Sequence, residues 1–163
     1  MFKSIDGLWI GFWSNFWDER YSSTRKHPDF KIKVIDHKKQ RYNTVGDYYY
    51  NIFGSLVILV SDMGDWRMEY LIAFHELSEI PLCWEAGITN RMIDEFDMEY
   101  DSRRKPGDAS EPGDDPDCPY FKCHQYASQQ EREMCAKFGI DWDEYDNRIA
   151  ELLNKRAQEE AKK

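Results

Sequence analysis

The chain has no run of eighteen apolar residues, so no transmembrane helix is expected. It contains none of the motifs GxxxxGKS, GxxxxGKT, GxGxxG or GxSxG, which leaves nucleotide-binding and serine-hydrolase functions without support. The N-terminus also has no apolar stretch followed by a small-residue cleavage site, as a signal peptide would have. We therefore expect a protein of the cytoplasm.

Concentrated positive charge is scarce. The formal net charge is −9, and residues 94–117 alone hold ten acidic and three basic residues. Binding to nucleic acid needs a basic surface that neutralises phosphates, and the only candidate is the run from Arg20 to Arg41. No nucleic-acid partner is expected, and a peptide or protein is the favoured substrate or partner.

Paired cysteine motifs are missing too. The four cysteines are spread through the chain, as expected for a reducing cytoplasm. Cys118 and Cys123, followed by His124, have ligand types suited to structural zinc, but no second pair accompanies them. Cys83 and Cys135 lie on apolar helix faces and are most simply buried packing residues.

Small apolar residues are few, whereas large rings are abundant: six Trp, ten Tyr and nine Phe. A chain of 163 residues is the size of one domain. Residues 1–30 form an aromatic N-terminal arm, and residues 31–163 form the domain. The arm is either a partner-binding segment or, more simply, a segment packed on the domain.

The patterning predicts an α+β fold, in which a small β-sheet packs against a central helix with three further helices. Residues 101–119 hold four of the six prolines among charges and are expected to be a solvated acidic loop. The expected strands are 31–37 and 54–61, with a turn at 45–47, and the expected helices are 65–85, 90–100, 120–138 and 141–157.

The central helix carries the sequence His75-Glu76-Leu77-Ser78-Glu79. Residues four apart lie on one helical face, so His75 and Glu79 have the spacing of metal ligands. The usual metalloprotease pattern HExxH has a second His where this chain has Glu79. Catalytic zinc is commonly held by two His and one carboxylate, with Glu76 in the position of a general base. Leu77 is expected on the buried face of the same helix.

A third ligand must come from elsewhere in the chain. His124 is the best remaining imidazole, because it opens a helix that can pack against the central one. Glu131 lies seven residues later on the same face and could orient a ligand from the second shell. Asp97, expected to face outward from its helix, is a weaker candidate for either shell. Zn²⁺ is the expected ion, although another divalent metal fits the same ligand types.

Three interpretations remain open. The first is a zinc-dependent hydrolase with His75, Glu79 and His124 as ligands and Glu76 as base, acting on a peptide that lies along a strand edge. The second is a non-enzymatic accessory protein with a structural metal that binds another protein. The third is a hydrogen-bonded polar cluster without metal.

Several segments, in order, resemble a group of small uncharacterised proteins encoded by bacteriophages and prophages. This resemblance covers about residues 31 to 150 and implies a phage origin and the host-cell cytoplasm, but no activity. More distantly, a strand followed by an HExxx helix resembles the core of minimal zincin-like metallopeptidases, which implies a zincin-like core. The phage-like segments are RYNTVGDYY, VSDMGDWRMEYLIAFHELSE, GIT, EFD, EPGDDPDCPY, HQYAS and FGIDWDEYD.

Overall fold

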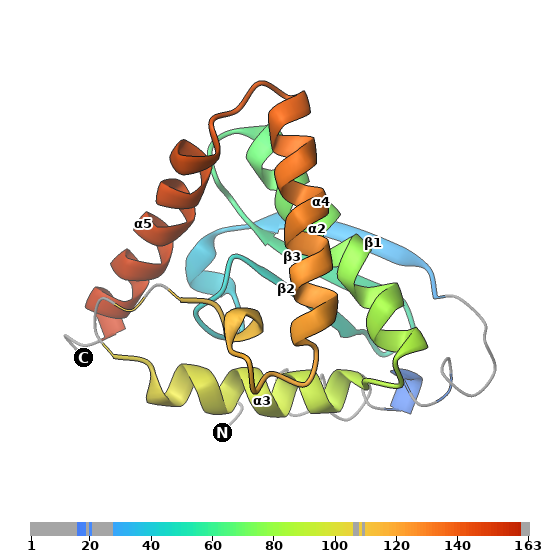
Figure 1. The fold of residues 1–163 in the computed structure, drawn as a ribbon. Coiled ribbons are helices and arrows are strands. Elements are labelled where there is room, and N and C mark those ends of the chain that lie inside the picture. The colour runs from blue at the N-terminus through green and yellow to red at the C-terminus, as the bar shows by residue number, and fades with distance from the viewer. Residues whose placement is uncertain (1–15, 19, 21–27, 106–107, 109, 161–163) are drawn as a thin grey trace.

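The computed structural model describes residues 16–18, 20, 28–105, 108 and 110–160. Within them it shows an α+β fold, in which a three-stranded mixed sheet is accompanied by four long helices (Figure 1). This confirms the predicted class and the central helix with three further helices. Most of the aromatic arm at 1–30 lies outside the described residues.

The sheet has the order β1-β3-β2. Strand β1 (Phe30–Ile35) runs parallel to β3 (Leu56–Ser61), while β2 (Gly46–Tyr50) runs antiparallel to it. Every residue of β3 is buried, as its continuous apolar sequence predicts for a central strand. Strand β2 was not predicted, because Gly46-Asp47 reads as a turn signal although both residues belong to this strand.

Strand β1 forms one edge of the sheet and is half-exposed. Its apolar residues Ile32 and Val34 are 50% and 49% exposed, so they contribute less to the core than their alternation with lysines predicts. Lysines on an edge strand discourage pairing with another chain. The core therefore lies between the other two strands and the helices.

Helix α2 (Trp66–Glu85) is the central element. Asp65 caps its start, where the carboxylate accepts a hydrogen bond from the Arg67 amide, and Gly87 follows its end with a φ of 72°. Both ends agree with the prediction. The expected burial of Leu77 is wrong, since this side chain is 36% exposed, because the helix packs on one broad face against the sheet and α4.

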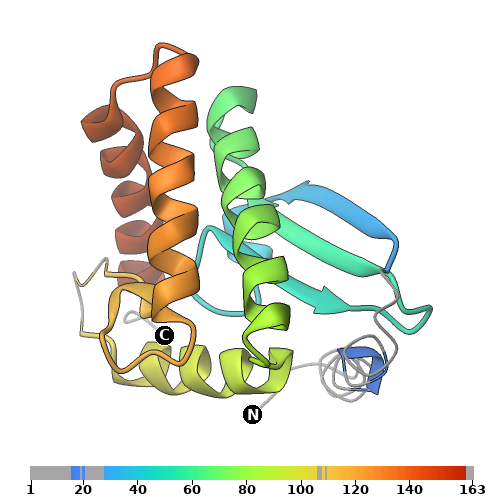
Figure 2. The ribbon, with the colours of Figure 1, turned by 45° about the vertical axis from the view of Figure 1, so that its right-hand side comes forward.

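Three further helices surround the site side of α2. Figure 2 shows α2 and α4 (Phe121–Lys137) running side by side, with the sheet beyond α2 and α5 (Trp142–Glu160) on the far side of α4. Helix α3 (Asn90–Arg103) crosses the lower end of this pair. Two short 3₁₀ helices, η1 (His37–Lys39) and η2 (Pro112–Asp114), complete the described chain.

The stretch 101–119 departs from the prediction of a solvated loop. Helix α3 continues into it as far as Arg103, and the later part folds inward at η2, where Pro112 and Gly113 are buried. The charged residues in this stretch suggested exposure to solvent. Pro112 and Gly113, which lie between them, have no charge and allow the backbone to pack on α4.

The described residues of the arm pack on the domain. The Trp17 ring lies where a Cβ on Gly54 would come within 2.8 Å of it, and the Asp18 carboxylate accepts a 2.7 Å hydrogen bond from the Asn90 amide at the start of α3. None of the described helices is long and apolar enough to cross a membrane.

Candidate metal centre

Two predicted ligands come from one turn of α2. His75 and Glu79 are both buried and point to the same side of the helix. Their nearest side-chain atoms, His75 Nε2 and Glu79 Oε2, are 3.5 Å apart. The spacing of four residues, read from the sequence, therefore produces the predicted pair.

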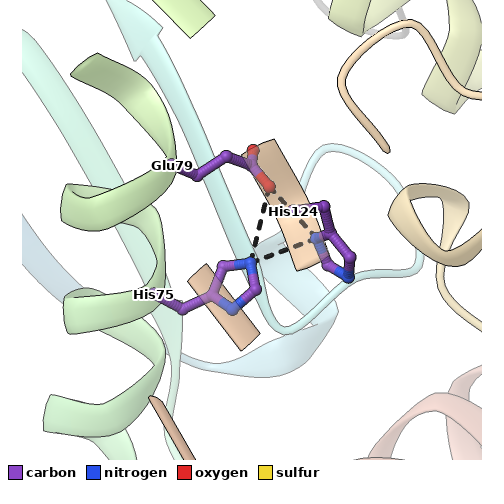
Figure 3. A group of neighbouring side chains, drawn as sticks. All are labelled: His75, Glu79 and His124. Atoms are coloured by element: carbon purple, nitrogen blue, oxygen red, sulfur yellow. Dashed lines mark hydrogen bonds and ion pairs between the residues drawn. The ribbon is translucent and has the colours of Figure 1, made fainter. Parts of the chain in front are cut away.

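His124 meets this pair from the first turn of α4 (Figure 3). Its Nδ1 atom lies 3.1 Å from His75 Nε2 and 3.1 Å from Glu79 Oε2. The contact between residues 75 and 124, on which the sequence interpretation depended, is present because α2 and α4 pack along their length. The three side chains form a group that could hold a metal ion.

The dimensions of the group fit a small divalent ion. Two ligand atoms bound tetrahedrally to zinc at its usual bond lengths lie about 3.3–3.5 Å apart. The three separations of 3.1, 3.1 and 3.5 Å are close to this edge length. A trigonal face of two imidazole nitrogens and one carboxylate oxygen leaves a further coordination position open.

Glu131 contacts the other ring nitrogen of His75, Nδ1. Its Oε2 atom lies 2.9 Å from His75 Nδ1, which directs the other ring nitrogen toward Glu79 and His124. Tyr145, fully buried on α5, donates a hydrogen bond to the second oxygen of Glu131. This chain of contacts fixes the ring orientation and makes the imidazole a stronger ligand. Tyr145 was not anticipated, because no motif links it to the other residues.

Hydrogen bonds to carboxylates raise the pKa of both imidazoles. Burial alone would lower the pKa of His75, but hydrogen bonds to Glu131 and Glu79 outweigh burial and hold this pKa well above the usual value. For His124, burial again acts to lower the pKa. Hydrogen bonds to Asp114 and Glu79 outweigh burial and raise this pKa to about 10. Because metal ligation needs neutral imidazoles, metal binding must displace protons here.

Glu76, the predicted general base, lines the same cavity of about 70 Å³ as the three ligands. Burial, reinforced by the nearby Glu79 carboxylate, raises the pKa of Glu76 well above its usual value. Its carboxylate rests on the backbone of Gly46, where an added Cβ would lie 2.2 Å from Glu76 Oε1. Only glycine at position 46 leaves this space free.

A second glycine, Gly113, packs against His124. A Cβ on Gly113 would lie 2.4 Å from both Cγ and Nδ1 of the His124 ring, so η2 packs directly on this imidazole. Asp114 Oδ1, in the same segment, is 3.5 Å from His124 Nε2. The sequence analysis missed these residues and Glu111. The one sequence feature that could have indicated these residues is the segment EPGD at 111–114, which is also typical of an exposed turn.

Asp97 does not join the metal group, and its expected outward orientation is wrong. It is buried and accepts hydrogen bonds of 2.7 Å from the Tyr42 hydroxyl and 2.6 Å from the Tyr120 hydroxyl. Burial raises the pKa of Asp97 to about 7, even though both tyrosines act to lower it. It therefore forms a separate polar cluster that lines the same cavity.

This pKa predicts a specific dependence of folding stability on pH. Between about pH 4 and 7 the folded protein keeps a proton on Asp97 that the unfolded chain has lost, so this group makes stability fall as pH rises. The expected slope is at most about 1.4 kcal/mol per pH unit. Urea unfolding from pH 4 to 8 should show a flatter profile for Asp97→Asn than for wild type. The exposed control Glu99→Gln should keep the wild-type slope, and an unchanged slope in Asp97→Asn would contradict the assignment.

The cysteines form no competing metal site in the described part of the chain. Cys83, Cys118, Cys123 and Cys135 are all buried free thiols, and none belongs to the group of ligand atoms. Cys83 and Cys135 are core residues, as predicted. Burial raises the pKa of Cys118 to about 12, so it is a thiol at neutral pH.

Comparisons with known proteins identify no relative: no family model, curated protein or solved structure matches this chain.

Proposed function

We propose that this chain is a phage-encoded, metal-dependent hydrolase, with zinc as the ion and with His75, Glu79 and His124 as its ligands. One observation carries the proposal. Three potential ligand atoms from two helices lie within 3.5 Å of one another inside a cavity that also receives the Glu76 carboxylate. The HExxx helix next to a buried strand supports a zincin-like arrangement by analogy only.

The residues have distinct roles in this proposal. A divalent ion in such a site acts as a Lewis acid toward an acyl carbonyl. Glu131 and Tyr145 hold the His75 ring in its ligating orientation, which reduces the reorganisation needed when the ion binds. Glu76, held against Gly46, accepts the proton of the attacking water and later delivers it to the leaving group.

The number of protein ligands favours catalysis over a structural role. Structural zinc is held by four protein ligands, commonly including cysteines, whereas catalytic zinc has three and an open position. Among the described residues the group has three members and no cysteine. A closed four-ligand site would instead favour the alternative of a non-enzymatic accessory protein. For both alternatives we propose that the protein works in the host-cell cytoplasm, because reduced cysteines such as its four free thiols persist there.

Metal analysis of protein purified without chelator tests the proposal. We expect about one equivalent of zinc in the wild type and loss of bound zinc in His75→Ala and His124→Ala. In Glu131→Gln the metal affinity should fall by about 10- to 100-fold, because the orienting carboxylate is weakened. The exposed control Glu133→Gln, on the same helix, should bind like wild type. Wild-type protein without stoichiometric metal would remove the basis of the proposal.

A further inference from the structure

The cavity is unusually rich in carboxylates. Within the part of the chain that the structure describes, seven acidic side chains line it, and no lysine or arginine side chain does. Most of these carboxylates have partners. Asp47 and Asp94 are held by the Arg41 guanidinium, whose nitrogens lie 2.6 Å and 2.8 Å from them. One guanidinium thus pairs with both carboxylates, and its single positive charge offsets one of their two negative charges.

Three more acids are satisfied by other groups. Asp97 accepts hydrogen bonds from two tyrosine hydroxyls, Glu79 contacts both imidazoles, and Glu131 contacts His75. Glu76 has the role of base in the proposed function. Of the seven described acids that line the cavity, Glu111 is then the one left with neither a side-chain partner nor a role.

Glu111 faces the metal group from the segment that precedes η2. Burial raises the pKa of Glu111, whereas His124 and His75 act to lower it. A partly buried carboxylate without a partner is costly, so this position favours a positively charged group from a ligand.

The free edge of β2 limits the form of that ligand. Paired residues of the antiparallel strands β2 and β3 alternate between hydrogen-bonded and non-hydrogen-bonded positions. The hydrogen bonds from the Ser61 amide to the Val45 carbonyl and from the Asn51 amide to the Ser55 carbonyl fix this alternation. Gly46 and Tyr48 occupy non-hydrogen-bonded positions, so their backbone N–H and C=O groups point away from β3. The carbonyl oxygens of Gly46 and Tyr48 each already accept a hydrogen bond from a side chain.

The occupying groups belong to Thr44 and Arg41, of which Thr44 lines the cavity and Arg41 does not. The Thr44 hydroxyl donates to the Gly46 carbonyl at 2.7 Å, and the Arg41 guanidinium donates to the Tyr48 carbonyl at 3.0 Å. A peptide that pairs along β2 in both directions needs these carbonyls as acceptors. The edge of β2 therefore offers these two carbonyls to an extended peptide only as shared acceptors.

We propose that the cavity binds the end of a peptide or related acyl compound that bears a free ammonium group, with the Glu111 carboxylate as the partner of that ammonium. This inference rests on the proposed function, because the metal group would hold the neighbouring carbonyl. A volume of about 70 Å³ suits a small chain end better than a long internal segment. The amides of Gly46 and Tyr48 remain as donors toward ligand oxygens.

Two small probes isolate the ammonium group. Alanine hydroxamate and propionohydroxamate share a metal-binding hydroxamate and the same carbon skeleton, and only the first carries an amine. Calorimetry with zinc-loaded protein at neutral pH should show at least about tenfold tighter binding of alanine hydroxamate. Glu111→Gln should lose this preference and still bind propionohydroxamate. Asp117→Asn removes one charge from the same segment outside the cavity and should keep the preference.

Each outcome separates this inference from the function beneath it. Equal affinity for both probes in zinc-loaded wild type would overturn the role of Glu111 and leave the hydrolase proposal standing. Absence of zinc from the wild type would remove both. If Glu111→Gln lowered the metal content from two equivalents to one, Glu111 would be a ligand of a second cation, which would also overturn the inference.

Discussion

Replacing Glu76 with Gln is expected to lower the hydrolytic rate by about 100- to 10,000-fold, the range that a general base contributes. The amide has the shape of the carboxylate but cannot accept a proton. It should also remain in the space above Gly46, where the Glu76 carboxylate now lies. The zinc content should stay at the wild-type level, because Glu76 is not among the three ligand residues.

The measurement combines turnover and metal analysis on the same preparation. Turnover of fluorogenic peptides with free amino termini reports the rate, and Glu85→Gln, an exposed change on the same helix, serves as the control. Full activity in Glu76→Gln would exclude Glu76 from the reaction. Loss of zinc together with activity would assign Glu76 to the metal instead.

Replacing Gly113 with Ala is expected to weaken zinc binding by more than about 100-fold, beyond the range for loss of an orienting group. The added methyl would lie 2.4 Å from Cγ of the His124 ring, close to the root of the side chain. Rotation of the imidazole about its bond to Cβ cannot relieve a clash at Cγ, because Cγ lies on the rotation axis. The whole imidazole must move away from His75 and Glu79, which opens the triangle of ligand atoms.

Gly46→Ala provides a matched comparison, because it adds the same methyl at another glycine that lines the cavity. Here the nearest atom is Glu76 Oε1, the end of a flexible side chain that can swing aside. We expect Gly46→Ala to keep zinc and lose activity, while Gly113→Ala loses both. Zinc titration followed by a thermal unfolding scan separates loss of the ion from loss of the fold. Equal zinc affinity in both variants would contradict the placement of His124 against η2.

Local sequence signals predicted the helices well. Asp65 and Thr89 cap α2 and α3 through hydrogen bonds to nearby amides, and Gly87 adopts the positive φ expected after a helix end. These features depend on residues within one or two turns of each other. The same locality explains why the pair His75 and Glu79 could be recognised from the spacing alone.

Signals that depend on distant residues were harder to interpret. Gly46 suggested a turn but lies in β2, since pairing with β3 and the approach of Glu76 decide its conformation. Asp97 was expected to face solvent, but hydroxyls from Tyr42 and Tyr120 make its burial acceptable. A charged residue cannot be placed from its own type when its partners are far away in the sequence.

The sequence by itself determined the α+β class, the ends of the central helix and the two candidate ligands that one helical turn brings together. Only the tertiary structure decided that His124 completes the group, because that contact depends on how α2 and α4 pack. It also decided that Glu131 and Tyr145 support the site and that Glu111 faces it. Backbone hydrogen bonding and capping act over a few residues, whereas a binding site is assembled by side-chain packing between segments that the sequence keeps apart.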